Sequence, residues 1–143
     1  MDGKFEKSCG AILYCYDEDG ALRYLLIRQC NEPLFYGFPK GHVEGEETEL
    51  QTAKREIDEE VGLSPQFHPD FREENRYPLP NKPGVTKISV YYLASFDASE
   101  PVATQPEEVS DCVLLPYQDA MAKLRSDMQV ILSKANQYIL QRA

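Results

Sequence analysis

A cluster of carboxylates between residues 56 and 60 has the residue types and spacing to do chemistry. Glu56 lies three and four residues before Glu59 and Glu60, so on a helix the three side chains share one face. Like charges at this spacing destabilise a helix by roughly 0.2–0.5 kcal/mol per pair. A divalent cation would offset that repulsion, because magnesium prefers carboxylate oxygens. The cluster therefore indicates a magnesium site, with a solvated acidic surface helix as the alternative.

A helix over residues 47–61 would carry these carboxylates. Apolar residues at helical spacing would bury its opposite face against a core: Leu50, Ala53, Ile57 and Val61. Gly62 follows as the expected C-terminal stop. Arg55 lies inside the acidic cluster, where it could pair with Glu47 or Glu59 and fix the geometry of the carboxylates.

The segment from Gly41 to Leu63 resembles the Nudix box, G-x5-E-x7-R-E-U-x-E-E-x-G-U, in which U is an aliphatic residue. All of its defined positions match: Gly41, Glu47, Arg55, Glu56, Ile57, Glu59, Glu60, Gly62 and Leu63. The resemblance implies an enzyme that adds water across a pyrophosphate linkage, with magnesium, or manganese in its place, as the cofactor. Such ions neutralise phosphate charge and orient the attacking water.

The resemblance also implies roles for these residues. The expected metal ligands are one backbone carbonyl and three carboxylates: Gly41, Glu56, Glu59 and Glu60. Glu59 or Glu60 would also position or deprotonate the attacking water, and Arg55 with Glu47 would form an orienting pair. Nudix enzymes often recruit one more carboxylate from a late loop. Glu107 and Glu108 are the candidates for it and Glu108 is favoured, the alternative being an exposed loop.

Residues that flank the box resemble those of asymmetrical diadenosine tetraphosphate hydrolases. They are the lead-in FPKGHVE at residues 38–44 and, after Asn81-Lys82-Pro83, the strand-like KISVYYL at residues 87–93. This likeness implies hydrolysis of diadenosine tetraphosphate to ATP and AMP. The chain departs from that pattern at Gly45-Glu46, where Pro-Gly is usual, and it has no tryptophan.

Six side chains are the candidate substrate contacts: Lys40, His42, Tyr77, Lys82, Lys87 and Tyr91. A long polyphosphate needs cations beyond the metal ions, and the three lysines could supply them. The two tyrosines could stack on adenine. The alternatives are core packing for the tyrosines, Tyr91 more than Tyr77, and a solvated loop for Lys82.

The remaining pattern predicts an α/β fold, the Nudix fold, in which a mixed sheet is sandwiched between helices. Predicted strands are residues 8–16 and 22–28, joined as a hairpin, and then 87–96 and 112–115. Predicted helices after the box are 116–124 and 128–140. The proline-rich stretch 64–86 is expected to be irregular, with one short strand around 71–77.

Length and charge limit the function classes. The chain has 143 residues and a net charge of −9, so we expect a single domain over 1–143 that binds neither nucleic acid nor an anionic membrane. It has no membrane-length apolar run and no signal-peptide pattern near its start, which favours a cytoplasmic location. Monomer and homodimer both stay open. Cys9, Cys15 and Cys112 lie in apolar runs and are expected to be buried free thiols.

Other functions stay open beside the preferred one. The same fold serves other Nudix specificities, which act on modified nucleoside triphosphates, RNA 5′ ends or diphosphoinositol phosphates. The acidic charge argues against the last two, since both substrates favour a basic surface. A non-catalytic nucleotide sensor would be favoured if a carboxylate of the box were replaced, and none is.

Overall fold

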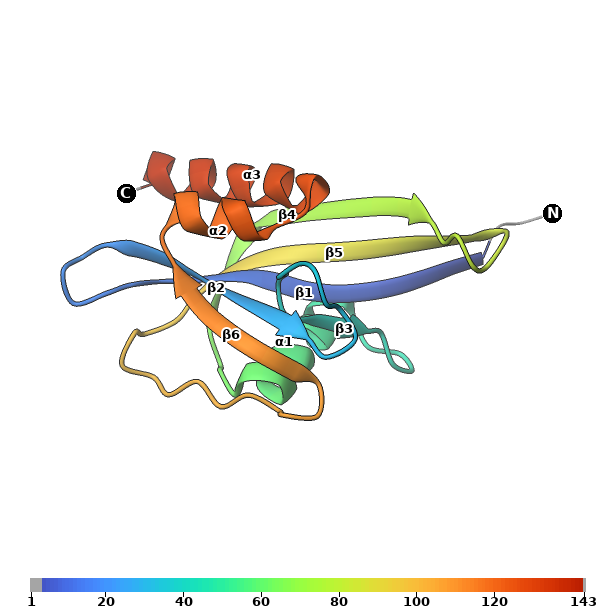
Figure 1. Cartoon of the computed structure of the whole chain (residues 1–143), viewed down its shortest axis with the longest axis horizontal. Helices are drawn as coiled ribbons and strands as arrows, with labels where there is room; N and C mark the ends of the chain where they lie inside the picture. Colours follow the sequence, from blue (N-terminus) through green and yellow to red (C-terminus); the bar gives the residue numbers. More distant parts are fainter. Residues whose placement is uncertain (1–3, 143) are drawn as a thin grey trace.

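The computed structural model describes residues 4–142, which form a six-stranded mixed sheet with helices on both of its faces (Figure 1). The elements in chain order are β1 Lys4–Tyr16, β2 Leu22–Gln29, β3 Lys40–His42, α1 Glu49–Val61, β4 Gln66–Pro78, β5 Val85–Ser95, β6 Val109–Leu115, α2 Tyr117–Lys123 and α3 Ser126–Arg142. The strand order is β4-β5-β1-β2-β6, and β3 pairs with β1 outside this path. The predicted mixed sheet between helices is confirmed.

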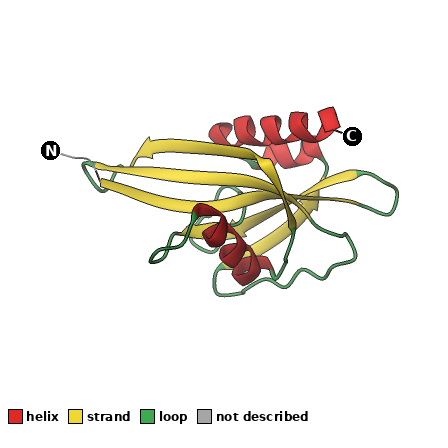
Figure 2. Ribbon diagram, turned by 180° about the vertical axis from the view of Figure 1, so that it is seen from behind, coloured by secondary structure: helices red, strands yellow, loops and turns green. Residues whose placement is uncertain are grey.

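The helices divide between the two faces of the sheet: α1 covers one face, and α2 with α3 covers the other (Figure 2). The central strand β1 serves both layers. Its Ile12 and Tyr14 belong to the core cluster that contains α2 and α3, whereas Leu13 and Cys15 belong to the cluster that contains α1. Because both faces are covered, the strand is an almost continuous apolar run instead of an alternating one.

Strand β1 brings the start of the Nudix box to the centre of the sheet. It pairs in parallel with β5 and antiparallel with β2 and β3. In the β3 pairing Cys9 lies opposite Gly41, and Gly10 lies opposite Lys40. A Cβ atom on Gly10 would lie 1.9 Å from the carbonyl oxygen of Pro39. A glycine there is therefore what allows this short strand to dock.

The prediction of an irregular stretch over 64–86 was wrong for its first half. Strand β4 runs for 13 residues, from Gln66 to Pro78. Its prolines are tolerated because β4 is an edge strand. In addition, its pairing with β5 is irregular between Phe67 and Arg72, which is where Pro69 lies. Strand β3 was not predicted at all.

Helix α1 begins two residues later than predicted. Thr48 is its N-cap, and Thr48 and Gln51 form a reciprocal capping box, so Glu47 lies outside the helix. Gly62 ends the helix with a φ of 70°, as predicted for a left-handed C-cap. Cys9 and Cys15 are buried as predicted, whereas Cys112 is only partly buried, because it lies on the edge strand β6. Within residues 4–142, no helix has the length and apolar character needed to cross a membrane.

Candidate active site

Helix α1 holds the box carboxylates by burying the opposite side of the helix. Ala53, Ile57 and Val61 are fully buried against the sheet. Of the three box carboxylates, Glu60 is only 3% exposed, whereas the side chain of Glu59 is 48% exposed. The three therefore share one helix but differ strongly in their contact with water.

Arg55 is the hub of the carboxylate cluster. Its Nε donates to Oε2 of Glu47 at 2.7 Å and its Nη2 donates to Oε1 at 3.0 Å, a two-bond pair. Its Nη1 donates to Glu56 at 2.9 Å and to Glu59 at 3.3 Å. The hydrogen bonds that Glu47 accepts, first those from Arg55 and then that from the backbone of Glu44, lower the pKa of Glu47 to about 2. The structure therefore contains the predicted contact between Arg55 and Glu47, and Arg55 also contacts two further carboxylates.

Glu47 also ties the loop before α1 to the helix. Its Oε1 accepts hydrogen bonds from the backbone N–H of Glu44 at 3.0 Å and from Oγ1 of Thr52 at 2.9 Å. Thr52 is fully buried, and its contact with Glu47 was not foreseen from the sequence. The position of Arg55 is thus set by a carboxylate that is itself held from three directions.

Glu60 is a buried carboxylate with two donors. Its Oε1 accepts the backbone N–H of Lys40 at 3.0 Å, and its Oε2 accepts Nε2 of Gln29 at 3.2 Å. Burial, with repulsion from Glu56 and Glu108, raises the pKa of Glu60 to about 8. The negative charge at this position is therefore under-compensated by the protein.

Gly41 lies directly against Glu56. A Cβ atom at this position would lie 2.0 Å from the carboxyl carbon of Glu56, so any other residue would displace that carboxylate. The sequence predicted a special role for Gly41, and the structure shows a steric reason for glycine: the backbone of β3 and the side chain of Glu56 share the available space.

A cavity of about 520 Å³ collects the carboxylates from α1 and from the late loop. We call it the acidic cavity; its acidic lining residues are Glu44, Glu56, Glu60, Glu107 and Glu108. The backbone N–H of Cys30 donates to the carbonyl of Glu108 at 2.8 Å, which holds the late loop beside the end of β2. Both late-loop candidates thus reach the cavity. Burial foremost, with Glu108 as a smaller cause, raises the pKa of Glu56 and of Glu60. Glu59 is not among the lining residues.

The donor set of the acidic cavity suits a hard divalent cation. Its carboxylate oxygens are the atoms that magnesium and manganese prefer, and the mutual repulsion of Glu56, Glu60 and Glu108 is what a cation would relieve. Within residues 4–142, no three acidic, histidine or cysteine side chains are yet arranged around one metal position. The reason is local, because Arg55 and the Gln29 amide occupy carboxylate oxygens that a metal ion would need.

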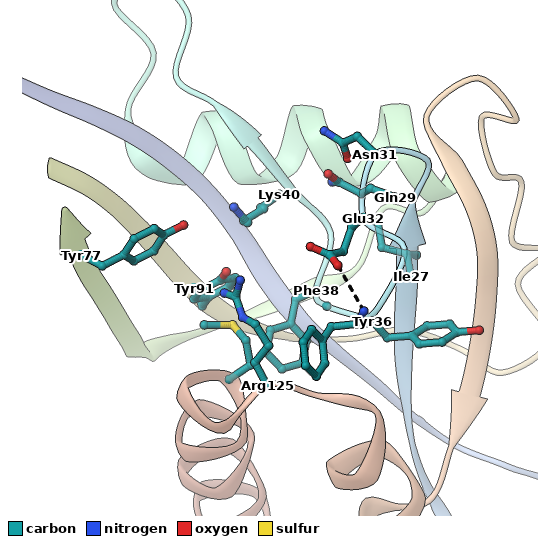
Figure 3. Close-up of a pocket in the computed structure, with 13 residues that line it drawn as sticks. Ile27, Gln29, Asn31, Glu32, Tyr36, Phe38, Lys40, Tyr77, Tyr91 and Arg125 are labelled. Atoms are coloured by element: carbon teal, nitrogen blue, oxygen red, sulfur yellow. Dashed lines mark hydrogen bonds between the residues drawn. The ribbon is translucent and has the colours of Figure 1, made fainter. Parts of the chain in front are cut away.

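A second cavity, of about 240 Å³, adjoins the acidic cavity and is lined largely by aromatic side chains (Figure 3). We call it the aromatic cavity; its aromatic lining residues are Phe35, Tyr36, Phe38, Tyr77 and Tyr91. Tyr91 is 2% exposed and packs edge-on against Phe38 at 5.5 Å between ring centroids. It therefore belongs to the core and also forms part of the cavity wall, whereas Tyr77 is more accessible.

The candidate cations separate into two groups. Lys40 lines both the acidic and the aromatic cavity, and burial lowers its pKa to about 8. His42 lines the acidic cavity. Lys87 is 7% exposed and donates to Oγ of Ser8 at 2.6 Å. The side chain of Lys82 is 54% exposed and pairs with Glu6 at 2.7 Å, and neither Lys87 nor Lys82 lines either of these two cavities.

Sequence reasoning missed several polar lining residues. Gln29, Asn31 and Glu32 come from the end of β2 and the loop after it, and Arg125 comes from the break between α2 and α3. None of them lies in a motif, and their meeting depends on the packing of elements that are distant in sequence.

The chain has clear relatives. The NUDIX domain family matches residues 7–135. An asymmetrical bis(5′-nucleosyl)-tetraphosphatase of Sus scrofa is 29% identical over 146 residues, which cover 90% of this chain and 97% of that protein. The Caenorhabditis elegans protein of the same name is 31% identical over 104 residues, covering 71% of this chain and 72% of that protein.

Solved structures agree with this family. The crystal structure of a C. elegans Ap4A hydrolase binary complex superposes with a TM-score of 0.86 at 26% identity, covering 95% of this chain and 98% of that chain. The NUDIX domain of Shewanella oneidensis NrtR, complexed with ADP ribose, shares the fold with a TM-score of 0.74 at 21% identity, covering 97% and 90%. With the family match spanning most of the sequence, the chain belongs to the NUDIX domain family, has the Nudix fold, and is a pyrophosphohydrolase.

Proposed function

We propose that the chain hydrolyses diadenosine tetraphosphate to ATP and AMP in a magnesium-dependent reaction, with manganese able to replace magnesium. The observation that carries this proposal is a row of three adjoining cavities. The acidic and aromatic cavities share Gln29, Asn31 and Lys40. The aromatic cavity shares Phe35, Tyr77 and Arg125 with a third cavity of about 610 Å³, which we call the outer cavity. A row of this kind suits a long substrate with a nucleoside at each end.

Charge along the row supports a polyphosphate. The chain carries a net charge of −9, yet Lys40 lies between the acidic and aromatic cavities. Burial, and then repulsion by the charge of Lys87, lowers the pKa of Lys40 to about 8. A phosphate chain placed here would relieve that repulsion. Tyr77 would then offer its ring to a nucleobase.

The residues of α1 would do the chemistry at the scissile phosphorus. Glu56, Glu60 and Glu108, with the carbonyl of Gly41, would hold the divalent ion, which supplies neutralisation of the phosphate charge when bound. Arg55 and Glu47 would keep the carboxylates oriented, and Glu59 or Glu60 would accept the proton of the attacking water. Lys40 would compensate the negative charge that the leaving phosphate gains.

A hydrolysis panel tests this proposal. Diadenosine tetraphosphate, nucleoside triphosphates, oxidised nucleotides, nucleotide sugars, capped RNA and a diphosphoinositol phosphate are each incubated with the protein and magnesium, and products are separated by ion exchange. Among these substrate classes we expect the highest kcat/KM for the dinucleoside tetraphosphate, equal amounts of ATP and AMP from diadenosine tetraphosphate, and loss of turnover in EDTA. A product mixture dominated by ADP, or a higher kcat/KM for another substrate class, would refute the proposal.

A further inference from the structure

Arg125 holds a position in the row of cavities that the metal chemistry does not use. It lies in the break between α2 and α3 and lines both the aromatic and the outer cavity, together with Tyr77 and Phe35. Its side chain is 44% exposed. A cation at this place in an acidic protein faces the position where a nucleoside would lie in the proposed function.

The plane of the Arg125 guanidinium is fixed from one edge. Its Nε and Nη2 each donate to Asp127 at 3.2 Å, and Asp127 also accepts Nδ2 of Asn75 at 2.9 Å and its neighbouring backbone N–H, that of Met128, at 3.0 Å. This leaves Nη1, the second N–H of Nη2 and both faces of the guanidinium available to a ligand, so two parallel donors remain at its end. A guanidinium held in this way is a directional donor as well as a point charge.

The same contacts fix the distance from Arg125 to Tyr77. Asn75 and Tyr77 are two residues apart on β4, so their side chains project from the same face of the strand. The bond from Asn75 to Asp127 docks that face onto the first turn of α3. Figure 3 shows Tyr77 and Arg125 reaching into one space from these two elements.

Glu32 reaches the aromatic cavity from the loop after β2 (Figure 3). Its Oε1 accepts the backbone N–H groups of Leu34 at 3.0 Å and Phe35 at 3.3 Å. These bonds fix the carboxylate in place, and within residues 4–142 its Oε2 has no hydrogen-bond partner. The cavity thus offers a fixed acceptor from one element and a fixed donor from another.

We propose that Arg125 and Glu32 make the aromatic cavity selective for a guanine base over an adenine base, a specificity that rests on the proposed function and refines its substrate. Guanine presents two acceptors, O6 and N7, on the edge that arginine recognises by two parallel hydrogen bonds. Its N1–H and amino group are donors that a carboxylate accepts. Adenine places an amino group where O6 would be, so the donors of Arg125 would face another donor.

The competing role for Arg125 is a phosphate contact, and it makes a different prediction. A phosphate contact depends mainly on positive charge, so a lysine would preserve much of it and the loss would not depend on the base. Recognition of a base edge depends on the planar fork, so Arg125→Lys would lose as much as Arg125→Met. The two substitutions together therefore separate the roles.

The first test compares kcat/KM for diguanosine and diadenosine tetraphosphate in wild type, Arg125→Lys, Arg125→Met and Glu32→Gln. We expect a guanine preference of roughly tenfold, at the low end of what an arginine–guanine contact discriminates, and its loss in all three variants, mostly through KM. Arg76→Met is the matched control: Arg76 lies on β4 between Asn75 and Tyr77 and lines neither the aromatic nor the outer cavity, and among residues 4–142 its ion pair is with Glu74. A guanine preference that persists in Arg125→Met, or full retention in Arg125→Lys, would overturn the inference.

The second test measures base binding without hydrolysis. Calorimetric titration of the wild-type protein with GMP and with AMP should give tighter binding of GMP, and Arg125→Met should make the two affinities equal. Equal affinities in the wild type would overturn the guanine preference. This readout is independent of the reaction, so GMP selectivity in a protein that fails to cleave dinucleoside tetraphosphates would reject the proposed substrate while keeping the base preference.

Discussion

Arg55 donates to both carboxylate oxygens of Glu47, at 2.7 and 3.0 Å, from a position one residue before the partly buried Glu56. Through its remaining nitrogen the same guanidinium reaches Glu56 and Glu59. Glu47 lies outside α1 and is held by the loop and by Thr52. The loop before α1 therefore positions Glu47, Glu47 positions Arg55, and Arg55 in turn contacts the carboxylates of Glu56 and Glu59.

Arg55→Lys should weaken metal activation, because lysine cannot donate two parallel bonds to Glu47 and still reach Glu56. We expect a roughly 10–100-fold loss in magnesium affinity or activity, as is typical when a group that orients metal ligands is removed. The measurement is the magnesium concentration that gives half-maximal turnover.

Arg72→Lys is the matched control for Arg55→Lys. Arg72 makes a similar fork to Glu49, at 2.9 and 3.0 Å, and Glu49 does not line the acidic cavity. We expect its magnesium dependence to equal that of the wild type. Equal shifts in both variants would show that the effect is general destabilisation and not orientation of the ligands.

Gly41→Ala should remove activity while the fold persists. The added methyl group would lie 2.0 Å from the carboxyl carbon of Glu56, and the side chain of Glu56 is free enough to turn away. Gly37→Ala compares the general cost of replacing a glycine, because no heavy atom lies within 4 Å of a Cβ at that position. Thermal melting and magnesium titration of both variants check this, and normal magnesium activation in Gly41→Ala would contradict it.

Local sequence predicted the parts of the site that depend on local geometry. Helix α1, its glycine stop and the pairing of Arg55 with Glu47 all lie within the 23 residues of the Nudix box. The position of the late-loop carboxylate, in contrast, depends on contacts between segments that are distant in the sequence. The choice between Glu107 and Glu108 depends on how the loop before β6 is held by Cys30, at the end of β2, and no sequence pattern encodes that.

The features that the sequence did not predict all depend on contacts between segments that are distant in the sequence. Strand β4 was predicted only as a short strand around 71–77, because prolines argue against a longer one, and only its place at the sheet edge makes them acceptable. Arg125 was missed because its approach to Tyr77 depends on the bond from Asn75 to Asp127, two residues 52 positions apart. Lys82 and Lys87 were both candidate substrate contacts, and the structure places Lys82 in solvent, paired with Glu6, and Lys87 in the interior.

Glu59→Gln should abolish magnesium-dependent turnover without unfolding the chain, because an exposed amide replaces an exposed carboxylate of the same shape. Glu60→Gln should do the same, since its amide oxygen can still accept the N–H of Lys40. A loss of roughly 10²–10⁴-fold is expected for whichever residue accepts the proton of water. Asp58→Asn, an exposed neighbour on α1, is the control, and near-normal turnover of Glu59→Gln would remove it from the assigned role.

Lys87→Met should weaken hydrolysis of long polyphosphates more than that of short ones. The Lys87 ammonium is buried beside Ser8, and its charge acts on Lys40 and His42, so its field would reach phosphates beyond the scissile one. Lys82→Met removes a charge that is already paired with Glu6 in solvent and should cost little. The measurement is kcat/KM for dinucleoside tri-, tetra- and pentaphosphates, and equal losses across these lengths would exclude a phosphate contact for Lys87.

His68 should make the fold less stable in mild acid. Its ring stacks on Tyr14 at 5.7 Å and meets the edge of Tyr138, with Arg142 and Asp70 as the charges that act on it. Burial, reinforced by Arg142, lowers the pKa of His68 below its ordinary value of 6.5. As the pH falls, the unfolded chain therefore takes up a proton on His68 before the native state does. The contribution of neutral His68 to stability is present above pH 6.5 and is lost as the pH falls through the native pKa.

Replacement by glutamine isolates this contribution, because other groups titrate with their own signs. The pKa of Glu49 is lowered to about 2, mainly by its hydrogen bonds from Arg72, so its contribution to the stability of the fold is lost only below about pH 4.5. Glu60, with its pKa raised to about 8, changes stability in the opposite direction over the same range as His68. Urea unfolding of wild type and His68→Gln at pH 7.5 and 5.5 should show a larger fall in the wild type, and identical falls would mean that His68 is protonated as easily in the folded chain as in the unfolded one.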